Sequence, residues 1–545
     1  MSDTTTPTGE PESASPPAPG LARSTAIQAA GTALSRITGF GRIFALAYAL
    51  GAGRLADTYT LANNTPNIIY ELILGGVLSG TLLPVFVREL RRSDDKGEED
   101  GWRAVSAVFT LGLVAGAVLS LAFVVVAPLF IRLYTLRTGA DVGREQIAVA
   151  TRLLRLFAPQ VFFYGMISLT TALVRARRRF AAPMFAPVLN NLVVIGVFLA
   201  YPSVVGTRDL AEVGRDSGAL LLLGLGTTAG VAAMALAQFP LRTALRHLRF
   251  VWQPRHPAVK VVLGLSGWTL GWVLLNQIAL FIVYLLANSD AGDVTVYFLS
   301  YTIFLLPHGV VSVSIISAVQ PELSDRWAAG DTDGFRSQLS VGIRSIAVLL
   351  VPAAVGYVVL ARPIVSMLLE HGALGDASAA RVAGTLALMA IGLPAFSIWL
   401  FLTSAYQAMQ NTRSLFFLYI VENAINIVAA LALYPVLGVQ GLGLALALAY
   451  LGGTATALVD LRRRLGGIEG GILARSLARI GAASALMAAV VLAVQAVTAG
   501  PGSAGFGAAL RAGAATVAGV TVYLVGCRVF RVGELRSLLA FRRRG

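Results

Sequence analysis

The sequence predicts an all-α integral membrane protein with fourteen transmembrane helices, arranged as two pseudo-symmetric six-helix lobes and a C-terminal helix pair. Three observations support this fold class. Hydrophobic residues make up 56% of the 545 residues and charged residues only 13%, the mean hydropathy is +0.74, and the apolar residues form repeated blocks. Most blocks reach about 20 residues, the length that a helix needs to cross a bilayer. Because a lipid-facing backbone must satisfy its own hydrogen bonds, we expect a helix for each block.

The blocks follow one another along most of the chain. Before them, residues 1–22 are rich in Pro, Ser and Thr and are expected to form a disordered tail, because they contain too little apolar surface to fold. The apolar blocks lie at residues 26–52, 56–87, 104–131, 147–174, 183–204, 217–240, 261–287, 294–319, 341–361, 381–408, 415–435, 441–460, 478–499 and 511–530.

A weak internal repeat predicts the two lobes. "LNNLVVIGVFLAYP" in block five and "AINIVAALALYP" in block eleven both carry an early Asn and a final Tyr-Pro. The block before each contains a central proline, Pro159 or Pro394. An offset of six spans gives both lobes the same orientation, as in transporters with parallel repeats; chance similarity between apolar strings is the alternative. The expected units are an N-lobe over 23–250 (spans 1–6), a C-lobe over 251–465 (spans 7–12), spans 13–14 over 466–532, and a basic tail over 533–545.

The positive charge of the chain predicts its orientation. The formal net charge is +15, and most of the 43 lysines and arginines lie in short clusters between alternate apolar blocks. This distribution follows the positive-inside rule and predicts that both termini lie in the cytoplasm. It argues against nucleic acid as a partner, because no soluble basic face is present.

Motifs for soluble chemistry are missing from the sequence. There is no P-loop, no nucleophile elbow, and no zinc-ligand spacing among four histidines and one cysteine, Cys527, which we expect to be a small packing residue. We therefore expect no catalytic residue, no metal and no cofactor. Transport by this chain would be driven by ion gradients, the membrane potential or the substrate concentration.

Two arginines interrupt the first apolar block. Arg36 and Arg42 lie well inside it, where an arginine costs roughly 2.5–3.5 kcal/mol at the bilayer centre. Residues six apart on a helix point about 120° apart, so both side chains can flank one cavity. We favour this cavity role over structural pairing with carboxylates, because block one contains no acidic residue of its own.

The second block combines polar residues with helix-breaking residues. Pro66 and the Gly75-Gly76 pair are expected to interrupt a block that is too long for one straight span. Asn67 and Glu71 are four residues apart and share a face. We favour pairing of Glu71 with Arg36 or Arg42 over titration. Asp57 lies at the start of the block, where a helix-capping role alone would explain it.

Further polar residues lie in the second half. Asn276 and Gln277 interrupt block seven, and Glu422 and Asn426 share a face of block eleven. His308 follows Pro307 in block eight. For a single histidine we favour a hydrogen-bonded packing role over a proton relay.

Three stretches of the chain together resemble the MurJ (MviN) family of lipid II flippases, in the MOP exporter superfamily. The first is "SRITGFGR" followed by "GAG", Asp57, "PN" at 66–67, Gly76, Ser79 and Pro84; the others are "RFAAPMFAPVLNN" at 179–191 and "AYQAMQNTRS" at 405–414. The resemblance covers roughly residues 24–530. It implies fourteen helices that span a bacterial plasma membrane, and a cationic central cavity. The implied function is transfer of lipid II, an undecaprenyl-pyrophosphate-linked peptidoglycan precursor, from the inner to the outer leaflet by alternating access.

The resemblance also implies site residues. Arg36 and Arg42 fall where the family has arginines that hold the pyrophosphate of the lipid, and guanidinium makes bidentate bonds to phosphate. The expected substrate-binding set is Arg36, Arg42, Asn67, Glu71 and Asn276. The expected gating or hinge set is Asp57, Pro66, Gly75 and Gly76.

The chain departs from the family pattern at several positions, which makes it a divergent member with a less cationic cavity. Ile43 replaces an acidic residue, Tyr70 and Glu71 replace paired arginines, and Thr302 replaces a further arginine. Three alternatives stay open: a flippase for another polyprenyl-linked polysaccharide, a drug/cation antiporter that uses Glu71 and Glu422, and a scaffold without transport. The expected partners are lipid II, membrane lipids, and peptidoglycan synthesis or division proteins.

Overall fold

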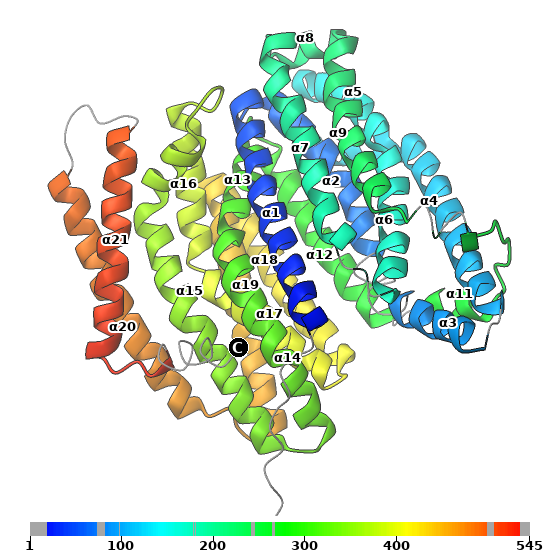
Figure 1. Cartoon of the computed structure of the whole chain (residues 1–545). Helices are drawn as coiled ribbons and strands as arrows, with labels where there is room; N and C mark the ends of the chain where they lie inside the picture. Colours follow the sequence, from blue (N-terminus) through cyan, green and yellow to red (C-terminus); the bar gives the residue numbers. More distant parts are fainter. Residues whose placement is uncertain are drawn as a thin grey trace, which may run out of the picture.

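The protein is helical throughout the residues that its computed structural model describes, which are 19–73, 82–96, 99–177, 179, 181–240, 243, 246–263, 267–498 and 506–534. Figure 1 shows two groups of long helices side by side, with a separate pair at one edge.

The first group, called the N-terminal half below, runs from α1 to α9. Its helices are α1 (Pro19–Leu50), α2 (Arg54–Ile73), α3 (Leu83–Lys96), α4 (Glu99–Tyr134), α5 (Ala140–Phe157), α6 (Pro159–Ala176), α7 (Ala181–Val204), α8 (Leu210–Arg215) and α9 (Ser217–Gln238).

The second group, called the C-terminal half, runs from α12 to α19 and is preceded by the short helix α11 (Pro257–Leu263). Its helices are α12 (Gly267–Ala287), α13 (Asp293–Pro307), the π-helix η2 (His308–Ser312), α14 (Val313–Ala328), α15 (Thr332–Leu369), α16 (Asp376–Ala390), α17 (Leu393–Ala408), α18 (Thr412–Leu437) and α19 (Val439–Leu465). The pair α20 (Gly470–Thr498) and α21 (Phe506–Val529) packs against α15 at the edge of this half (Figure 1).

Eleven helices in the described ranges are long and apolar enough to cross a membrane, and the bent pair α16–α17 adds a twelfth. The multispanning helical fold is therefore confirmed, while the count of fourteen stays a prediction. Where the structure describes them, the expected apolar blocks lie almost wholly in helices. Block two is divided between α2 and α3, and Gly75 and Gly76 lie outside the described residues.

Two proline positions singled out by the internal repeat coincide with helix breaks. α5 ends at Phe157 and α6 begins at Pro159, while α16 and α17 meet at a 51° bend just before Pro394. Proline is well suited to the first turn of a helix because it has no N–H to leave unpaired. Each break therefore falls where a proline starts the next helical segment.

Pro66 does not interrupt its helix, contrary to the expectation from its sequence. α2 continues from Arg54 to Ile73 through this proline. Hydroxyl and amide groups reinforce the same turn: Thr65 Oγ1 donates to the carbonyl of Leu61 at 2.6 Å, and Asn67 Nδ2 donates to the carbonyl of Asn63 at 3.4 Å. Both bonds lie in the turn around the proline, while the carbonyl that Pro66 leaves without its usual helical donor is that of Ala62.

Helix α1 lies between the two halves and packs mainly on α7 (Figure 1). Gly31 allows this close approach, because a Cβ atom there would lie 2.8 Å from Cβ of Met184 on α7. Behind α1, the N-terminal half is held by buried aromatic residues. The Tyr59 ring meets Phe157 and Phe198 edge-on, with ring centroids 5.7 and 5.3 Å away. Cys527 is buried beside α20 and fits the expected packing role.

Candidate functional site

Asp57 joins the two halves of the protein. Its side chain is fully buried in the first turn of α2. The carboxylate accepts hydrogen bonds from the backbone N–H of Gly292 (2.5 Å) and from the backbone N–H and hydroxyl of Thr295 (2.9 and 2.8 Å). These N–H groups belong to the start of α13, where a helix leaves its first donors unsatisfied. Asp57 therefore caps a helix of the opposite half, and not α2 itself as the sequence suggested.

Arg54 makes a second connection, to the end of α12. Its guanidinium donates to the carbonyl of Asn288 at 2.7 Å and to that of Ser289 at 2.8 Å. The side chain of Asn288 is in turn bonded to Gln146 of α5 at 2.8 Å and to the carbonyl of Tyr134 at 3.1 Å. The α12–α13 turn is therefore bonded to α2, α4 and α5 at once.

The end of α1 makes a third connection, to the turn between α15 and α16. The backbone N–H of Ala373 donates to the carbonyl of Tyr48 at 2.9 Å. Gly51 and Gly372 have φ of +68° and +65°, and a Cβ atom on Gly51 would lie 2.7 Å from the carbonyl oxygen of Ala373. We call these contacts, between residues 48–57 and residues 288–295 and 372–373, the interhalf contact. It closes one end of the protein.

A cavity of 340 Å³ lies deeper, between α2 and the C-terminal half. Its polar and tyrosine lining comes from α2, α12, α13, α18 and α19. These residues are Asn64, Asn67, Glu71, Asn276, Gln277, Tyr284, Tyr297, Tyr301, Glu422, Asn423, Asn426 and Tyr450. Two of them are carboxylates, and none is lysine or arginine. The cavity is thus acidic, in contrast to the cationic cavity that the family resemblance implies.

Hydrogen bonds order one wall of this cavity. Asn423 Nδ2 lies 2.8 Å from Asn276 Oδ1 and 2.7 Å from Glu422 Oε2, which links α12 to α18. Asn64 Nδ2 donates to the Tyr284 hydroxyl at 3.2 Å, which links α2 to α12. Asn426 Oδ1 has no hydrogen-bond partner within the described part of the chain. The cavity thus offers a free acceptor next to bonded amides.

The sequence-predicted binding residues fall into two groups. Asn67, Glu71 and Asn276 line the cavity together. Arg36 and Arg42 do not line it. The Arg36 guanidinium occupies the space that a side chain at Gly309 of η2 would fill.

Among the residues that the structure describes, neither arginine is paired with a carboxylate. Arg42 is half-buried and close enough to the Tyr59 hydroxyl of α2 for an electrostatic interaction. Across the described ranges, no ion pair joins Arg36 or Arg42 to an acid, so the expected pairing of Glu71 with them is not observed. The reason is that α1 packs on α7, whereas the Glu71 end of α2 faces the cavity of the C-terminal half.

His308 has the packing role that its sequence favoured. It is buried in η2, its Nδ1 lies 3.0 Å from the Ser397 hydroxyl, and its ring contacts Phe396 with centroids 4.7 Å apart. A π-helix commonly marks a local distortion within a longer helix. Here it lies between α13 and α14, where Arg36 approaches Gly309.

Sequence reasoning missed the partners of Asp57 and Arg54. Asn288, Gly292 and Thr295 lie in a short polar turn, "NSDAGDVT", between two apolar blocks. Only Gly292, with φ of +89°, has a conformation that favours glycine. Pairing over more than 230 positions leaves no local signal, and an aspartate at the start of an apolar block is explained equally well by a helix-capping role.

Comparisons with known proteins identify relatives over most of the chain. The family model for the lipid II flippase MurJ matches residues 46–512. A probable lipid II flippase MurJ of Rhizobium tropici is 28% identical over 466 residues, which covers 84% of each chain. The probable lipid II flippase MurJ of Thermotoga maritima is 25% identical over 511 residues, covering 93% of this chain and 96% of that protein.

Solved structures show the same fold. The structure of a lipid II flippase MurJ in an inward closed conformation matches with a TM-score of 0.74 and 19% identity, covering 94% of this chain and all of that one. A multidrug resistance MATE family transporter of the MOP superfamily, in an inward-facing conformation, matches with a TM-score of 0.63 and 14% identity, covering 79% of this chain and 96% of that one. At these identities the likeness concerns the fold alone.

Proposed function

Because the chain belongs to the lipid II flippase MurJ family, we propose that it moves lipid II from the inner to the outer leaflet of the bacterial plasma membrane by alternating access. The match of the family model over residues 46–512 carries this proposal. The peptidoglycan precursor is then exposed on the side of the membrane where the wall is built.

We place fourteen spans in this membrane, with both termini in the cytoplasm. The basic clusters between alternate apolar blocks support this orientation. The N-lobe covers residues 23–250 and the C-lobe 251–465, followed by the helix pair at 466–532. In this arrangement the interhalf contact lies at the outer surface, and the conformation described above is closed to the outside.

The pyrophosphate of the substrate binds to Arg36 and Arg42 on α1. Both arginines are free of carboxylate partners in the described part of the chain, so their charge is available to an anion. A guanidinium fork suits phosphate oxygens because it makes two parallel charge-assisted bonds. Arg36 lies beside Gly309 at the boundary between the halves, where a bound anion would touch both.

The acidic cavity binds uncharged parts of the headgroup. Asn67 and Asn276 offer amide groups to sugar hydroxyls and peptide groups, and the tyrosines offer apolar faces with polar tips. Glu71 and Glu422 add carboxyl groups that can hydrogen-bond to the same uncharged groups. The departures from the family pattern at Tyr70 and Glu71 are consistent with this division of the site.

Outward transfer requires the interhalf contact to open. The bonds of Asp57 and Arg54 to the α12–α13 turn would break, and Pro66 and the Gly75-Gly76 pair would accommodate bending of the second span. An interior-negative potential favours outward movement of the anionic headgroup by about 2.3 kcal/mol per charge for each 100 mV.

The test is a headgroup accessibility assay in vesicles that contain the purified protein and labelled lipid II. We expect label that starts on the inner leaflet to become accessible to an external enzyme or quencher, and the Arg36→Ala/Arg42→Ala double variant to abolish this transfer. Retention of full transfer by the double variant would contradict the binding role of the arginines. Absence of transfer by the wild-type protein would contradict the flippase function.

The acidic cavity supports one competing function, a drug/cation antiporter of the same superfamily. Glu71 and Glu422 are the carboxylates that such a transporter would need. Family membership favours the flippase. The same vesicles loaded with a cationic dye separate the two functions, since an antiporter would move the dye and leave labelled lipid II in place.

A further inference from the structure

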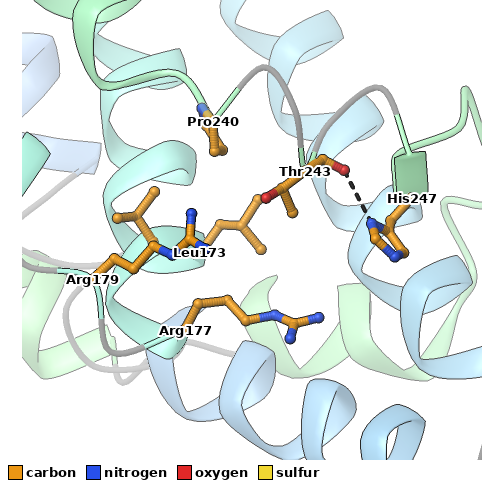
Figure 2. Close-up of a pocket in the computed structure, with 7 residues that line it drawn as sticks. Leu173, Arg177, Arg179, Pro240, Thr243 and His247 are labelled. Carbon is orange, nitrogen blue, oxygen red and sulfur yellow. Dashed lines mark hydrogen bonds between the residues drawn. The ribbon is translucent and has the colours of Figure 1, made fainter.

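A second, smaller cavity lies at the other end of the N-terminal half from the interhalf contact. Its volume is 220 Å³, and it is formed where α6 and α9 end. It is lined by Leu173, Val174, Arg177, Arg179, Pro240, Thr243 and His247. Figure 2 shows Arg177 and Arg179 on one side of this cavity, with Thr243 and His247 on the other. We call it the α6–α9 pocket. In the orientation proposed above it opens toward the cytoplasm.

The lining combines basic side chains with an apolar floor. Leu173 and Val174 are buried, whereas Arg179 and His247 are exposed at the rim. No carboxylate is among the seven lining residues. A cavity of this kind attracts an anion and also accepts an apolar group beside it.

Contacts with Trp102 of α4 position the basic groups. The Arg177 guanidinium carbon lies 5.0 Å from the Trp102 ring centroid, and the His247 ring stacks on Trp102 with centroids 4.4 Å apart. His247 Nδ1 is also 3.2 Å from the carbonyl oxygen of Thr243, as the dashed line in Figure 2 marks. Leu173 and Val174 on the floor of the pocket belong to α6, and Trp102 of α4 contacts two of its basic side chains.

The loop that follows the pocket presents aromatic residues to the surroundings. The backbone N–H groups of Arg249 and Val251 donate to Ser106 Oγ and Thr110 Oγ1 of α4, both at 3.2 Å. The intervening Phe250 and the next aromatic residue, Trp252, are 79% and 55% exposed. Exposed tryptophan beside basic residues is typical of the headgroup level of a membrane.

We propose that the α6–α9 pocket binds the phosphodiester headgroup of an anionic phospholipid from the cytoplasmic leaflet. Arg177 and Arg179 interact with the phosphate, and the Thr243 hydroxyl and His247 lie within the same cavity. Leu173, Phe250 and Trp252 contact the glycerol and upper acyl region. Basic pockets between membrane helices on the cytoplasmic side are known binding sites for such headgroups. The site is separate from Arg36 and Arg42 and adds a structural lipid to the proposed transport cycle.

A phospholipid fits this pocket better than a free phosphate ion or the transported substrate. The apolar floor and the exposed aromatic residues would make no favourable contact with an inorganic phosphate ion, whereas they can contact the apolar part of a phospholipid. All seven lining residues belong to the N-terminal half, so a ligand there would not meet the cavity shared by the two halves.

The test measures lipid retention by the full-length protein with native mass spectrometry, after purification in detergent and incubation with phosphatidylglycerol or phosphatidylcholine. We expect the wild type to retain phosphatidylglycerol preferentially. The Arg177→Gln/Arg179→Gln variant should weaken this binding on the order of 30-fold, since each basic residue near an anionic lipid contributes roughly a factor of five. The matched control, Arg132→Gln/Arg137→Gln, removes two exposed arginines from the opposite end of the same half and should retain the lipid.

Arg179→Glu provides a second variant, because this exposed side chain can be changed without disturbing the contact of Arg177 with Trp102. It should also lose phosphatidylglycerol. Equal losses in the control variant would overturn the proposal, since they would indicate nonspecific attraction. Stabilisation of the wild type against heat by inorganic phosphate alone, to the same extent as by phosphatidylglycerol, would also overturn it. Transfer of labelled lipid II is scored in parallel, so a failed lipid site is distinguishable from a failed flippase function.

Discussion

The Asp57 carboxylate accepts both the backbone N–H and the hydroxyl of Thr295, at 2.9 and 2.8 Å, from the first turn of a helix in the opposite half. These bonds exist only while the two halves meet at this end. A hydrogen bond to a charged group contributes about 1.5–3 kcal/mol. Asp57 therefore stabilises the closed end relative to any open state, which makes it a determinant of the conformational equilibrium.

Asp57→Asn should shift the protein toward a state in which the interhalf contact is open. The amide nitrogen of asparagine cannot accept the N–H of Gly292, so at least one charge-assisted bond is lost. We expect the ratio of closed to open molecules to fall on the order of tenfold. Spin labels on cysteines at the exposed positions Glu145 of α5 and Ala377 of α16 would report the change as a longer distance between the halves.

The control for this variant is Asp209→Asn. Asp209 also accepts two backbone N–H groups with its carboxylate, but both belong to α8 of the same half. The label distance should stay unchanged in this variant. An equal shift in both variants would mean that Asp57 acts through general stability and not through the interhalf contact.

Arg36 and Arg42 should differ from surface arginines in their tolerance of lysine. Lysine keeps the charge but cannot form the bidentate bonds of guanidinium. We expect Arg36→Lys and Arg42→Lys to reduce lipid II transfer in vesicles by about tenfold, and the alanine variants to abolish it. Arg144→Ala, which removes an exposed ion pair with Asp141, should leave transfer unchanged. Full transfer by both lysine variants would show that point charge alone is sufficient.

Asn423→Ala should destabilise the protein. Its amide nitrogen serves Asn276 and Glu422 in the cavity wall, and removing it leaves both acceptors without this donor. An unsatisfied buried polar group costs about 1–3 kcal/mol. Thermal unfolding in detergent should therefore occur at a lower temperature. Asn64→Ala, which removes one bond to a tyrosine hydroxyl, should have a smaller effect, and the reverse order would contradict the importance of the Asn423 bonds.

Glu534, which lies close to the C-terminus, should make the thermal stability of the protein depend on pH. Burial acts to raise the pKa of this carboxyl group, but hydrogen bonds from Ser476 and Arg344 and the Arg344 charge outweigh it, so the pKa lies below its usual value of 4.5. A depressed pKa stabilises the folded state above the unfolded value, and this contribution is lost as the pH falls through the folded value. The Glu534→Gln variant should thus unfold at a lower temperature than the wild type at neutral pH. The difference should shrink as the pH falls below 4.5 and vanish once the pH lies below the folded pKa; a constant difference would contradict this prediction.

The membrane fold could be predicted from sequence because it depends on local properties. Hydropathy and block length place the helices, and a proline marks the breaks before α6 and α17 because its effect acts within one turn. Pro66 shows the limit of this reasoning. Its helix continues from Arg54 to Ile73 through the proline, which the local sequence signal does not predict.

The candidate site was predictable only in part. Asn67, Glu71 and Asn276 could be singled out because polar residues are costly inside a span. Their assembly around one cavity depends on how α2 packs against α12 and α18. The separation of Glu71 from Arg36 has the same origin, since α1 packs on α7. The packing of helices against one another decides which polar residues become neighbours. The sequence of a single apolar block does not reveal this packing.

Arg54 offers a test of whether bonds between the two halves, and not bonds at this end of the protein in general, control the opening of the interhalf contact. Arg54 donates to the carbonyls of Asn288 and Ser289 in the opposite half. Arg208 makes a similar bond to the carbonyl of Ala49, at 2.7 Å, within its own half. Arg54→Gln should lengthen the label distance between positions 145 and 377, because two charge-assisted bonds disappear from the closed state alone.

Arg208→Gln should leave that distance unchanged while lowering thermal stability slightly. Arg54→Lys should fall between wild type and Arg54→Gln, since an ammonium group keeps the charge but not the fork that reaches both carbonyls. If Arg208→Gln opened the protein as far as Arg54→Gln, the closed state would depend on the integrity of the N-terminal half, and the direct bonds across the boundary would be secondary.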